Sequence, residues 1–176
     1  MAKNPSRKWP TTSFIIPTYN SGKTIESLLK TILIQDHPIV IEILIIDGGS
    51  TDKTIDIVKR YANKCNIRIL NNPLKLPSNA RRIGVNEAYG DVIVSIDSDM
   101  ELISRFWLRK MVGPLIKQNC VATYPSLLPN KKMGVISRVC AIMWPYGPGC
   151  YNFIAYGPPK IMSIDNFFTV GNIGFT

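Results

Sequence analysis

Short apolar runs alternate with amphipathic segments along the first hundred residues of the chain. The apolar runs are rich in β-branched residues and end at polar or turn-forming residues, as buried strands do; they lie at 13–16, 41–46, 67–70 and 92–96. The segments between them carry apolar residues at helical spacing; they lie at about 20–35, 54–61 and 79–89. Strands that alternate with helices predict an α/β fold with a mostly parallel central sheet and right-handed crossovers.

Turn and cap residues set the expected limits of these helices. Asn20 or Ser21 can cap the first helix, and Gly90 suits the position just after the third. Further along, Ser104 can cap a helix that Gly113-Pro114 should break or kink. Beyond it we expect a strand at 121–125, a helix at 133–144 and a loop rich in glycine, proline and aromatic residues at 145–159.

The chain of 176 residues has the size of one globular domain, and its hydrophobic content of 45% can supply a sizeable core. Residues 1–12 are polar and basic, so we expect a flexible basic lead-in there. No window reaches the ~18 uninterrupted apolar residues of a membrane span, and the amino-terminal residues lack the apolar core of a signal peptide. We expect neither a span nor a secreted precursor.

The cysteines and the single histidine argue against a zinc site. Cys65, Cys120, Cys140 and Cys150 show no Cys-x-x-Cys spacing, and His37 is the only histidine. Buried free thiols indicate a reducing compartment, so we expect a cytoplasmic location. His37 lies in a polar turn before Pro38, where we expect no catalytic role.

The formal net charge of +9 is concentrated late in the chain. Residues 102–176 contain eight basic residues and one acidic residue, Asp165. Such a surface faces an anionic partner or keeps the chain soluble by repulsion. No arginine-rich run, zinc finger or aromatic RNA-binding signature is present, so we predict no nucleic-acid partner. The aromatic and basic residues suit peripheral contact with an anionic membrane, at its cytoplasmic face. The same sequence pattern is also expected for a helix and a loop that only cover the core.

Asp97-Ser98-Asp99 is the strongest chemical signal in the chain. The two carboxylates end a buried apolar run, at the end of a strand where open α/β sheets bind ligands. Two like charges one residue apart repel each other, and a divalent cation or a metal-bound diphosphate against them would remove this repulsion. A solvated turn after a strand is the alternative that the motif alone leaves open.

Two more strand ends should meet this motif in one crevice. They are Pro17-Thr18-Tyr19-Asn20 and Asp47-Gly48-Gly49-Ser50. Tyr19 can pack on a nucleobase, Asp47 can accept a hydrogen bond from base or ribose, and a divalent ion on Asp99 can hold a diphosphate. The three strand ends together predict a site for a nucleoside diphosphate.

The same segments carry a family resemblance. The blocks at 14–20, 45–52, 80–84 and 96–99 resemble, in order, those of the N-terminal portion of a family 2 glycosyltransferase. The resemblance covers essentially residues 13–176. It implies the GT-A fold, a Rossmann-like three-layer α/β sandwich, with a donor-binding half at 13–101 and the start of the acceptor-side region at 102–176.

The resemblance also implies roles for individual residues. Pro17, Thr18, Tyr19 and Asn20 match the loop around the nucleoside, and Asp47 with Gly48 matches the second block. Of the Asp-x-Asp residues, Asp97 matches the acid near the ribose, with Ser98 next to it in the donor site, and the metal on the second acid lies at the diphosphate. Asp99 matches the ligand of Mn2+ or Mg2+, to which Asp97 also contributes. Arg81 matches an arginine beside the donor, and its planar fork suits a phosphate or a neighbouring carboxylate.

Two departures from the family pattern matter. Many members have a second aspartate where this chain has Gly48, and that acid often reads the base, so the donor can be UDP- or GDP-linked. Residues 169–176 resemble the block after the acceptor side, and the family's catalytic base normally follows it. We therefore expect the general base beyond Thr176, and we do not assign that role to Asp165.

The function implied by the resemblance is metal-dependent, inverting transfer of a sugar from a nucleotide-diphosphate donor to an acceptor hydroxyl, on a glycan or a lipid-linked sugar. A nucleotide-sugar-binding fragment without turnover is the first alternative. A sugar-phosphate nucleotidyltransferase is the second, but it usually has a glycine-rich loop with arginine after the first strand, and residues 17–20 do not fit that loop.

Overall fold

A sheet of parallel strands with an antiparallel edge forms the centre of the molecule. The computed structural model describes residues 9–36, 40–117, 122–123 and 173–175. Within these residues the strands are β1 (Thr12–Thr18), β2 (Val40–Asp47), β3 (Ile67–Asn71), β4 (Val92–Ser95), β5 (Ala122–Thr123) and β6 (Ile173–Phe175). Their order in the sheet is β3-β2-β1-β4-β6-β5. Strands β1 to β4 are parallel, and β6 runs antiparallel to both β4 and β5.

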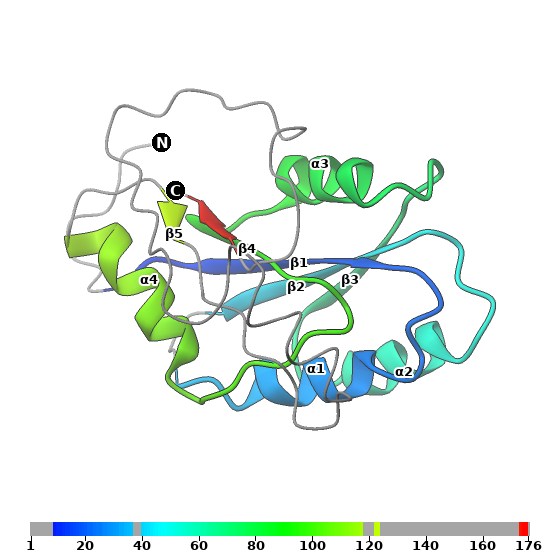
Figure 1. Ribbon diagram of the computed structural model, residues 1–176, viewed down its shortest axis with the longest axis horizontal. Coiled ribbons are helices and arrows are strands. Elements are labelled where there is room, and N and C mark those ends of the chain that lie inside the picture. Colours follow the sequence, from blue (N-terminus) through cyan, green and yellow to red (C-terminus); the bar gives the residue numbers. More distant parts are fainter. Residues whose placement is uncertain (1–8, 37–39, 118–121, 124–172, 176) are drawn as a thin grey trace, which may run out of the picture.

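Helices cover both faces of this sheet. They are α1 (Ile25–Leu33), α2 (Thr54–Tyr61), α3 (Pro77–Glu87) and α4 (Trp107–Lys117). Figure 1 shows α3 on one side of the strands and α1 and α2 on the other. The predicted three-layer α/β sandwich with a mostly parallel sheet is therefore confirmed. None of the helices in the described ranges has the length and apolar character needed to cross a membrane.

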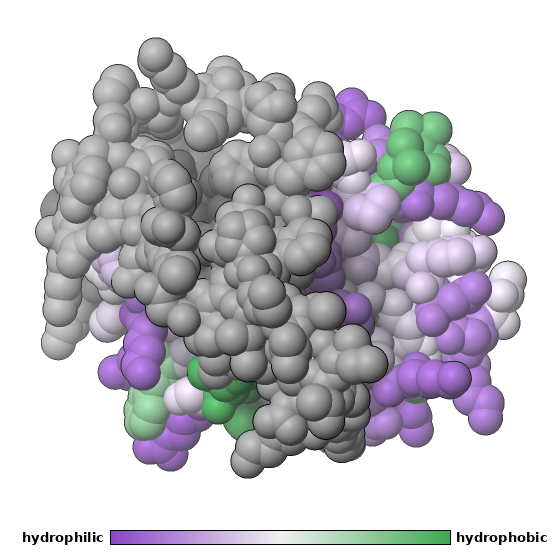
Figure 2. Space-filling model, viewed as in Figure 1, coloured by the Kyte–Doolittle hydropathy of each residue, from purple (hydrophilic) through white to green (hydrophobic). Residues whose placement is uncertain are grey.

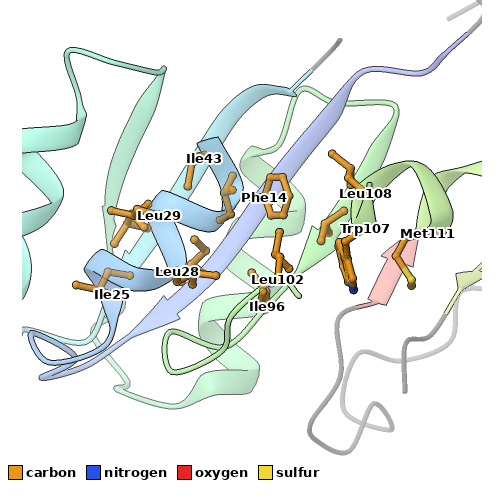
Figure 3. Packing of buried hydrophobic residues seen from close by; sticks show 14 of the residues in the cluster. Phe14, Ile25, Leu28, Leu29, Ile43, Ile96, Leu102, Trp107, Leu108 and Met111 are labelled. Carbon is orange, nitrogen blue, oxygen red and sulfur yellow. The ribbon is translucent and has the colours of Figure 1, made fainter. Parts of the chain in front are cut away.

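The larger core lies between the sheet and the helices α1, α2 and α4. Phe14 and Ile16 point from β1 into this core, where Leu28 from α1 and Leu108 from α4 are fully buried. Figure 3 shows Phe14 between the side chains of α1 and those of α4. The packing fixes both helices against β1, next to the strand ends that carry the predicted site.

A smaller core lies under α3. Ile15 alternates with its neighbours and points to this opposite face, where it packs with Ala80. The backbone of α3 approaches β1 closely at Gly84, because a Cβ there would lie 2.4 Å from Ile15 Cγ2. Only a glycine allows this distance, and it brings the start of α3, with Arg81, against the sheet.

The limits of two helices differ from the expected ones. Helix α1 begins at Ile25, since Asn20 has a φ of 46° and bonds to another loop instead of capping the helix. Helix α3 begins at Pro77, a residue that we placed in the preceding loop and that suits the first helical turn. It ends at Glu87 before an extended Ala88, so Gly90 does not cap it. Gly90 instead lies against β1, where its N–H donates to Ser13 Oγ at 2.8 Å.

The expected break at Gly113-Pro114 does not occur. Helix α4 continues through Pro114 to Lys117. Burial of Leu108 and Val112 holds the helix in place despite the missing proline N–H. Strand β5 falls within the predicted strand 121–125, and β6 was not predicted. The helix at 133–144, the loop at 145–159, His37 and Asp165 lie outside the described residues.

The predicted lead-in is too long at its carboxyl end. Strand β1 already begins at Thr12, and Thr11 is buried with its N–H and hydroxyl bonded to Asp91 Oδ2. Trp9 packs partly buried against the larger core. Residues 1–8 lie outside the described part of the chain.

Candidate functional site

The sheet order reverses at β1. The chain builds β2 and β3 on one side of β1 and then returns to place β4 on its other side. Ligands of open α/β sheets bind at such a switch point, outside the carboxyl ends of the strands. Residues 17–20 follow β1 and residues 97–99 follow β4, while Asp47 is paired with Thr18 at the end of β2. The structure thus brings together the three predicted strand ends.

An aromatic ring forms one side of this crevice. Tyr19 is half exposed, and the ammonium Nζ of Lys75 lies 5.5 Å from the centre of its ring. Lys75 belongs to the loop before α3 and has a φ of 56°. Gly48 lies between them, since a Cβ there would be 3.3 Å from the ring and 3.6 Å from Lys75 Cα. No local pattern in the sequence indicates Lys75, because its position depends on the fold of its loop.

The other residues of the first strand end are turned mainly toward protein. Pro17 lies within β1, paired with Ile46. Thr18 is buried, and its hydroxyl donates to the Ile16 carbonyl at 3.0 Å, while its own carbonyl accepts the Gly48 N–H at 2.8 Å. A direct contact of the Thr18 side chain with a nucleotide stays a prediction.

Asp47 organises its own turn. Its Oδ2 accepts the N–H groups of Gly49 and Ser50 at 2.9 and 2.8 Å, and its Oδ1 accepts the Ser50 hydroxyl. Gly49 has a φ of 82°, which this turn requires. A carboxylate offers about four lone-pair positions, so Asp47 retains capacity toward a ligand.

Hydrogen bonds join the loop after β1 to the loop after β2. The N–H of Asn20 donates to Ser50 Oγ at 2.9 Å, and Asn20 Oδ1 accepts the Thr51 N–H at 2.8 Å. The N–H of Gly22 donates to Asp52 Oδ2 at 2.9 Å, where a Cβ on residue 22 would collide with the same oxygen. The hydroxyl of Thr54 also donates to Asp52, and this bond is the main cause that lowers the pKa of Asp52. The two loops therefore form one bonded wall of the crevice.

Arg81 faces a carboxylate of the Asp-x-Asp motif. Its Nη2 lies 2.6 Å from Asp97 Oδ1, and both side chains remain partly exposed. The resemblance placed Arg81 beside the donor, and the structure brings the arginine to Asp97 from α3. This ion pair offsets part of the negative charge at the motif and leaves the outer donors of the guanidinium open to an anion.

Asp99 is the most open carboxylate of the motif. It lies in a turn closed by the Met100 N–H and the Asp97 carbonyl, at 3.2 Å. Its side chain is exposed and makes no hydrogen bond or ion pair with any other residue in the described ranges. Ser98, next to it, has its hydroxyl 2.7 Å from Ser21 Oγ.

The donor atoms at this turn fit a hard divalent cation that is shared with a substrate. Carboxylate oxygens are the ligands that Mg2+ and Mn2+ prefer. Among the described residues, no three acidic, histidine or cysteine side chains gather to hold an ion. Asp97 and Asp99 would therefore supply only part of the ligand set, and phosphate oxygens and water would complete it.

The strand order, the flanking helices and the strand ends that meet next to β1 define an α/β domain of the GT-A type. The chain belongs to glycosyl transferase family 2, whose family model matches residues 13–165. The predicted family is thereby confirmed.

Two bacterial relatives illustrate the similarity. The chain is 38% identical over 90 residues to the poly(ribitol-phosphate) beta-N-acetylglucosaminyltransferase TarS of Staphylococcus aureus, an alignment that covers 49% of this chain and 16% of TarS. The TarS structure in complex with UDP-GlcNAc matches with a TM-score of 0.63 at 29% identity, over 71% of this chain and 36% of that one. Glucosyl-3-phosphoglycerate synthase of Mycobacterium tuberculosis, in complex with Mn2+, UDP and phosphoglyceric acid, matches with a TM-score of 0.53 at 25% identity, over 64% and 42%.

An archaeal structure adds a different nucleotide. The mannosyltransferase PcManGT of Pyrobaculum calidifontis, in complex with GDP-Man and Mn2+, matches with a TM-score of 0.59 at 26% identity, over 66% of this chain and 38% of that one. The chain thus spans less than half the length of each of these relatives.

Proposed function

We propose that this chain binds a nucleotide-diphosphate sugar, UDP- or GDP-linked, with Mn2+ or Mg2+, and serves metal-dependent, inverting transfer of the sugar to an acceptor hydroxyl. The observation that carries the proposal is the exposed Asp99, in a turn at the switch point of the sheet and beside the Arg81–Asp97 pair. The complexes of the relatives with UDP, UDP-GlcNAc, GDP-Man and Mn2+ support the substrate class.

The side chains of the crevice divide the proposed work. Tyr19 offers a face for the nucleobase, and Asp47 retains lone pairs for base or ribose. Asp97 and Asp99 would hold the cation, which when bound would offset the negative charge that builds on the departing diphosphate. Arg81 places a second positive charge on the same side of the crevice.

The acceptor hydroxyl must also lose a proton as the new bond forms. We assign this role to none of the carboxylates of the described crevice. Asp97 is paired with Arg81, Asp47 with its own turn and Asp52 with Gly22 and Thr54. These pairings favour, as a second candidate, nucleotide-sugar binding by this chain without turnover.

Calorimetric titration tests the proposal. The chain is titrated with UDP, GDP and the corresponding nucleotide sugars, each with and without Mn2+. We expect one nucleotide to bind in a metal-dependent manner, and Asp99→Ala to abolish the metal-dependent part with little loss of folding, because Asp99 is exposed at a strand end. Metal-dependent affinity that survives Asp99→Ala would refute the assignment of Asp99 as a metal ligand. In a separate assay, transfer from a radiolabelled sugar donor distinguishes binding from turnover.

We also propose a cytoplasmic location with peripheral contact at an anionic membrane, near a glycan or lipid-linked acceptor. Support comes from the net charge and from the segment just before α4, where Ile103 and Phe106 are exposed and the Arg105 guanidinium lies 4.6 Å from the centre of the Phe106 ring. On the face seen in Figure 2 the described surface is mainly hydrophilic with small apolar patches, so the contact would be largely electrostatic. Failure to co-sediment with anionic vesicles at low salt would contradict it.

A further inference from the structure

The turn that carries Asp99 is attached to α1 through hydroxyl groups. After β4 the chain passes α1 on its way to α4 (Figure 1). The Ser21 hydroxyl lies 2.7 Å from that of Ser98, just before Asp99. Two residues after Asp99, Glu101 Oε1 accepts a hydrogen bond from the Ser27 hydroxyl at 2.6 Å. The backbone N–H of the next residue, Leu102, donates to Thr31 Oγ1 at 3.2 Å.

Helix α1 is a firm base for these contacts. Its residues Ile25, Leu28 and Leu29 are fully buried in the larger core. Ser27 and Thr31 are four residues apart, so their hydroxyls project from the same side of the helix. The segment 97–102 has no regular structure of its own. The orientation of the Asp99 side chain therefore depends on the hydrogen bonds of the residues on either side of it, Ser98 and Glu101.

The bond between Ser27 and Glu101 has a second consequence. A third carboxylate close to Asp97 and Asp99 would be able to turn toward the same cation. Ser27 holds Glu101 at α1 instead, and among the described residues no group of three acids gathers as a metal site. A cation held by Asp97 and Asp99 would then keep coordination places for a diphosphate, which a third carboxylate would occupy.

We propose that Ser27 and Glu101 are positioning residues: their hydrogen bond to each other, together with the Ser21–Ser98 contact, fixes the Asp99 turn for a metal-bound diphosphate. The inference rests on the proposed function. It adds two residues that touch neither nucleotide nor metal. Neither belongs to the strand-end motifs, and only their approach in the folded chain connects them.

The test compares the affinity for the nucleotide that binds, UDP or GDP, with and without Mn2+, in the full 176-residue chain. We expect Ser27→Ala and Glu101→Ala each to reduce the Mn2+-dependent gain in affinity by about three- to tenfold, the effect of one lost hydrogen bond of ordinary strength, because this bond is exposed to solvent. The double variant should lose little more than either single variant, because both remove the same bond. Metal-free affinity and melting temperature should stay unchanged, and Ser27→Thr should retain the gain.

Thr24→Ala is the matched control. It removes a hydroxyl next to the same helix whose one hydrogen bond to the described part of the chain goes to the Ser21 carbonyl, at 3.3 Å. A full Mn2+-dependent gain in Ser27→Ala, or losses that multiply in the double variant, would overturn the positioning role while leaving the proposed function intact. No metal-dependent gain in the unaltered chain would instead overturn the proposed function, and the positioning role with it.

Discussion

At the residue scale, the close packing around Tyr19 depends on the absence of a side chain at Gly48. The glycine is buried, and its missing Cβ lets the Tyr19 ring and the Lys75 backbone lie close to it, while the Lys75 ammonium lies 5.5 Å from the centre of the Tyr19 ring. Family members with an aspartate at this position would place a hydrogen-bond acceptor here. A lysine only donates, so this chain should read acceptor atoms of the base where an aspartate would read donors.

Tyr19 gives the first prediction at this scale. Its ring is 51% exposed, so it contributes little to the core and is available for stacking. Tyr19→Ala should weaken nucleotide binding by about 1–3 kcal/mol, which corresponds to about 5- to 150-fold in Kd, the usual value of an aromatic–base stack. Tyr19→Phe should bind almost normally, since the ring remains. Titration of both variants measures the effect, and equal affinity of Tyr19→Ala and the unaltered chain would remove Tyr19 from the site.

Sequence reasoning found the residues that end strands and missed those that connect loops. Asp99 and Tyr19 were predicted because the carboxyl ends of parallel strands meet at one edge. Asp52 was included only as the last residue of the block at 45–52, and nothing indicated its bond to Gly22. Such contacts depend on backbone conformations such as φ of 46° at Asn20 and 56° at Lys75, which local sequence does not determine.

At the element scale, the limits of a helix were predicted correctly where its own apolar pattern determines them. They were predicted wrongly where packing against another element determines them. Helix α2 runs from Thr54 to Tyr61 as predicted, because its own apolar face and flanking turn residues define it. Helix α3 lies earlier than predicted, because Pro77 starts it and Gly90 serves the contact with β1. Helix α4 tolerates Pro114 because its apolar face is buried.

The close approach of α3 to β1 can be tested by adding one methyl group. Gly84→Ala puts a Cβ 2.4 Å from Ile15 Cγ2, so the helix must move. We expect the free energy of unfolding to fall by about 1–3 kcal/mol, as for other overpacked cores. Urea unfolding followed by circular dichroism measures it.

A second helical glycine provides the control. A Cβ on Gly113 in α4 meets no atom within 4 Å. Gly113→Ala should therefore raise the free energy of unfolding by up to ~1 kcal/mol, the gain in helix propensity. Equal effects of the two substitutions would show that the α3 contact is looser than the structure indicates.

At the scale of the whole molecule, the sheet order places chemistry from distant parts of the chain at one edge. The carboxyl ends of parallel strands lie at one edge of a sheet, so the general location of the site was predictable, whereas the strand order that puts the switch point next to β1 comes from the structure. Strand β6 was not predictable, because its three residues, Ile173–Phe175, pair with β4, which lies about eighty residues earlier in the sequence. A pairing of that range leaves no periodic pattern in so short a segment.

The bond between the two loops also predicts how the molecule responds to acid. The hydrogen bonds from Thr54 and Gly22 lower the pKa of Asp52, so the folded state holds its proton less tightly than the unfolded state does. The resulting stabilisation is fully present above the ordinary aspartate pKa of about 3.9 and is lost as the pH falls through the lowered value. Asp52→Asn removes the charge and this pH dependence together.

Melting temperatures of both proteins between about pH 2 and pH 7 make the comparison. We expect the unaltered chain to be the more stable at neutral pH, with a difference that shrinks below the ordinary aspartate pKa and disappears once Asp52 is protonated in the folded state. Nucleotide affinity should follow the same trend, because Asp52 holds Gly22 and thereby the loop that carries Tyr19. A difference in melting temperature that does not change with pH would mean that Asp52 acts through its shape and not through its charge.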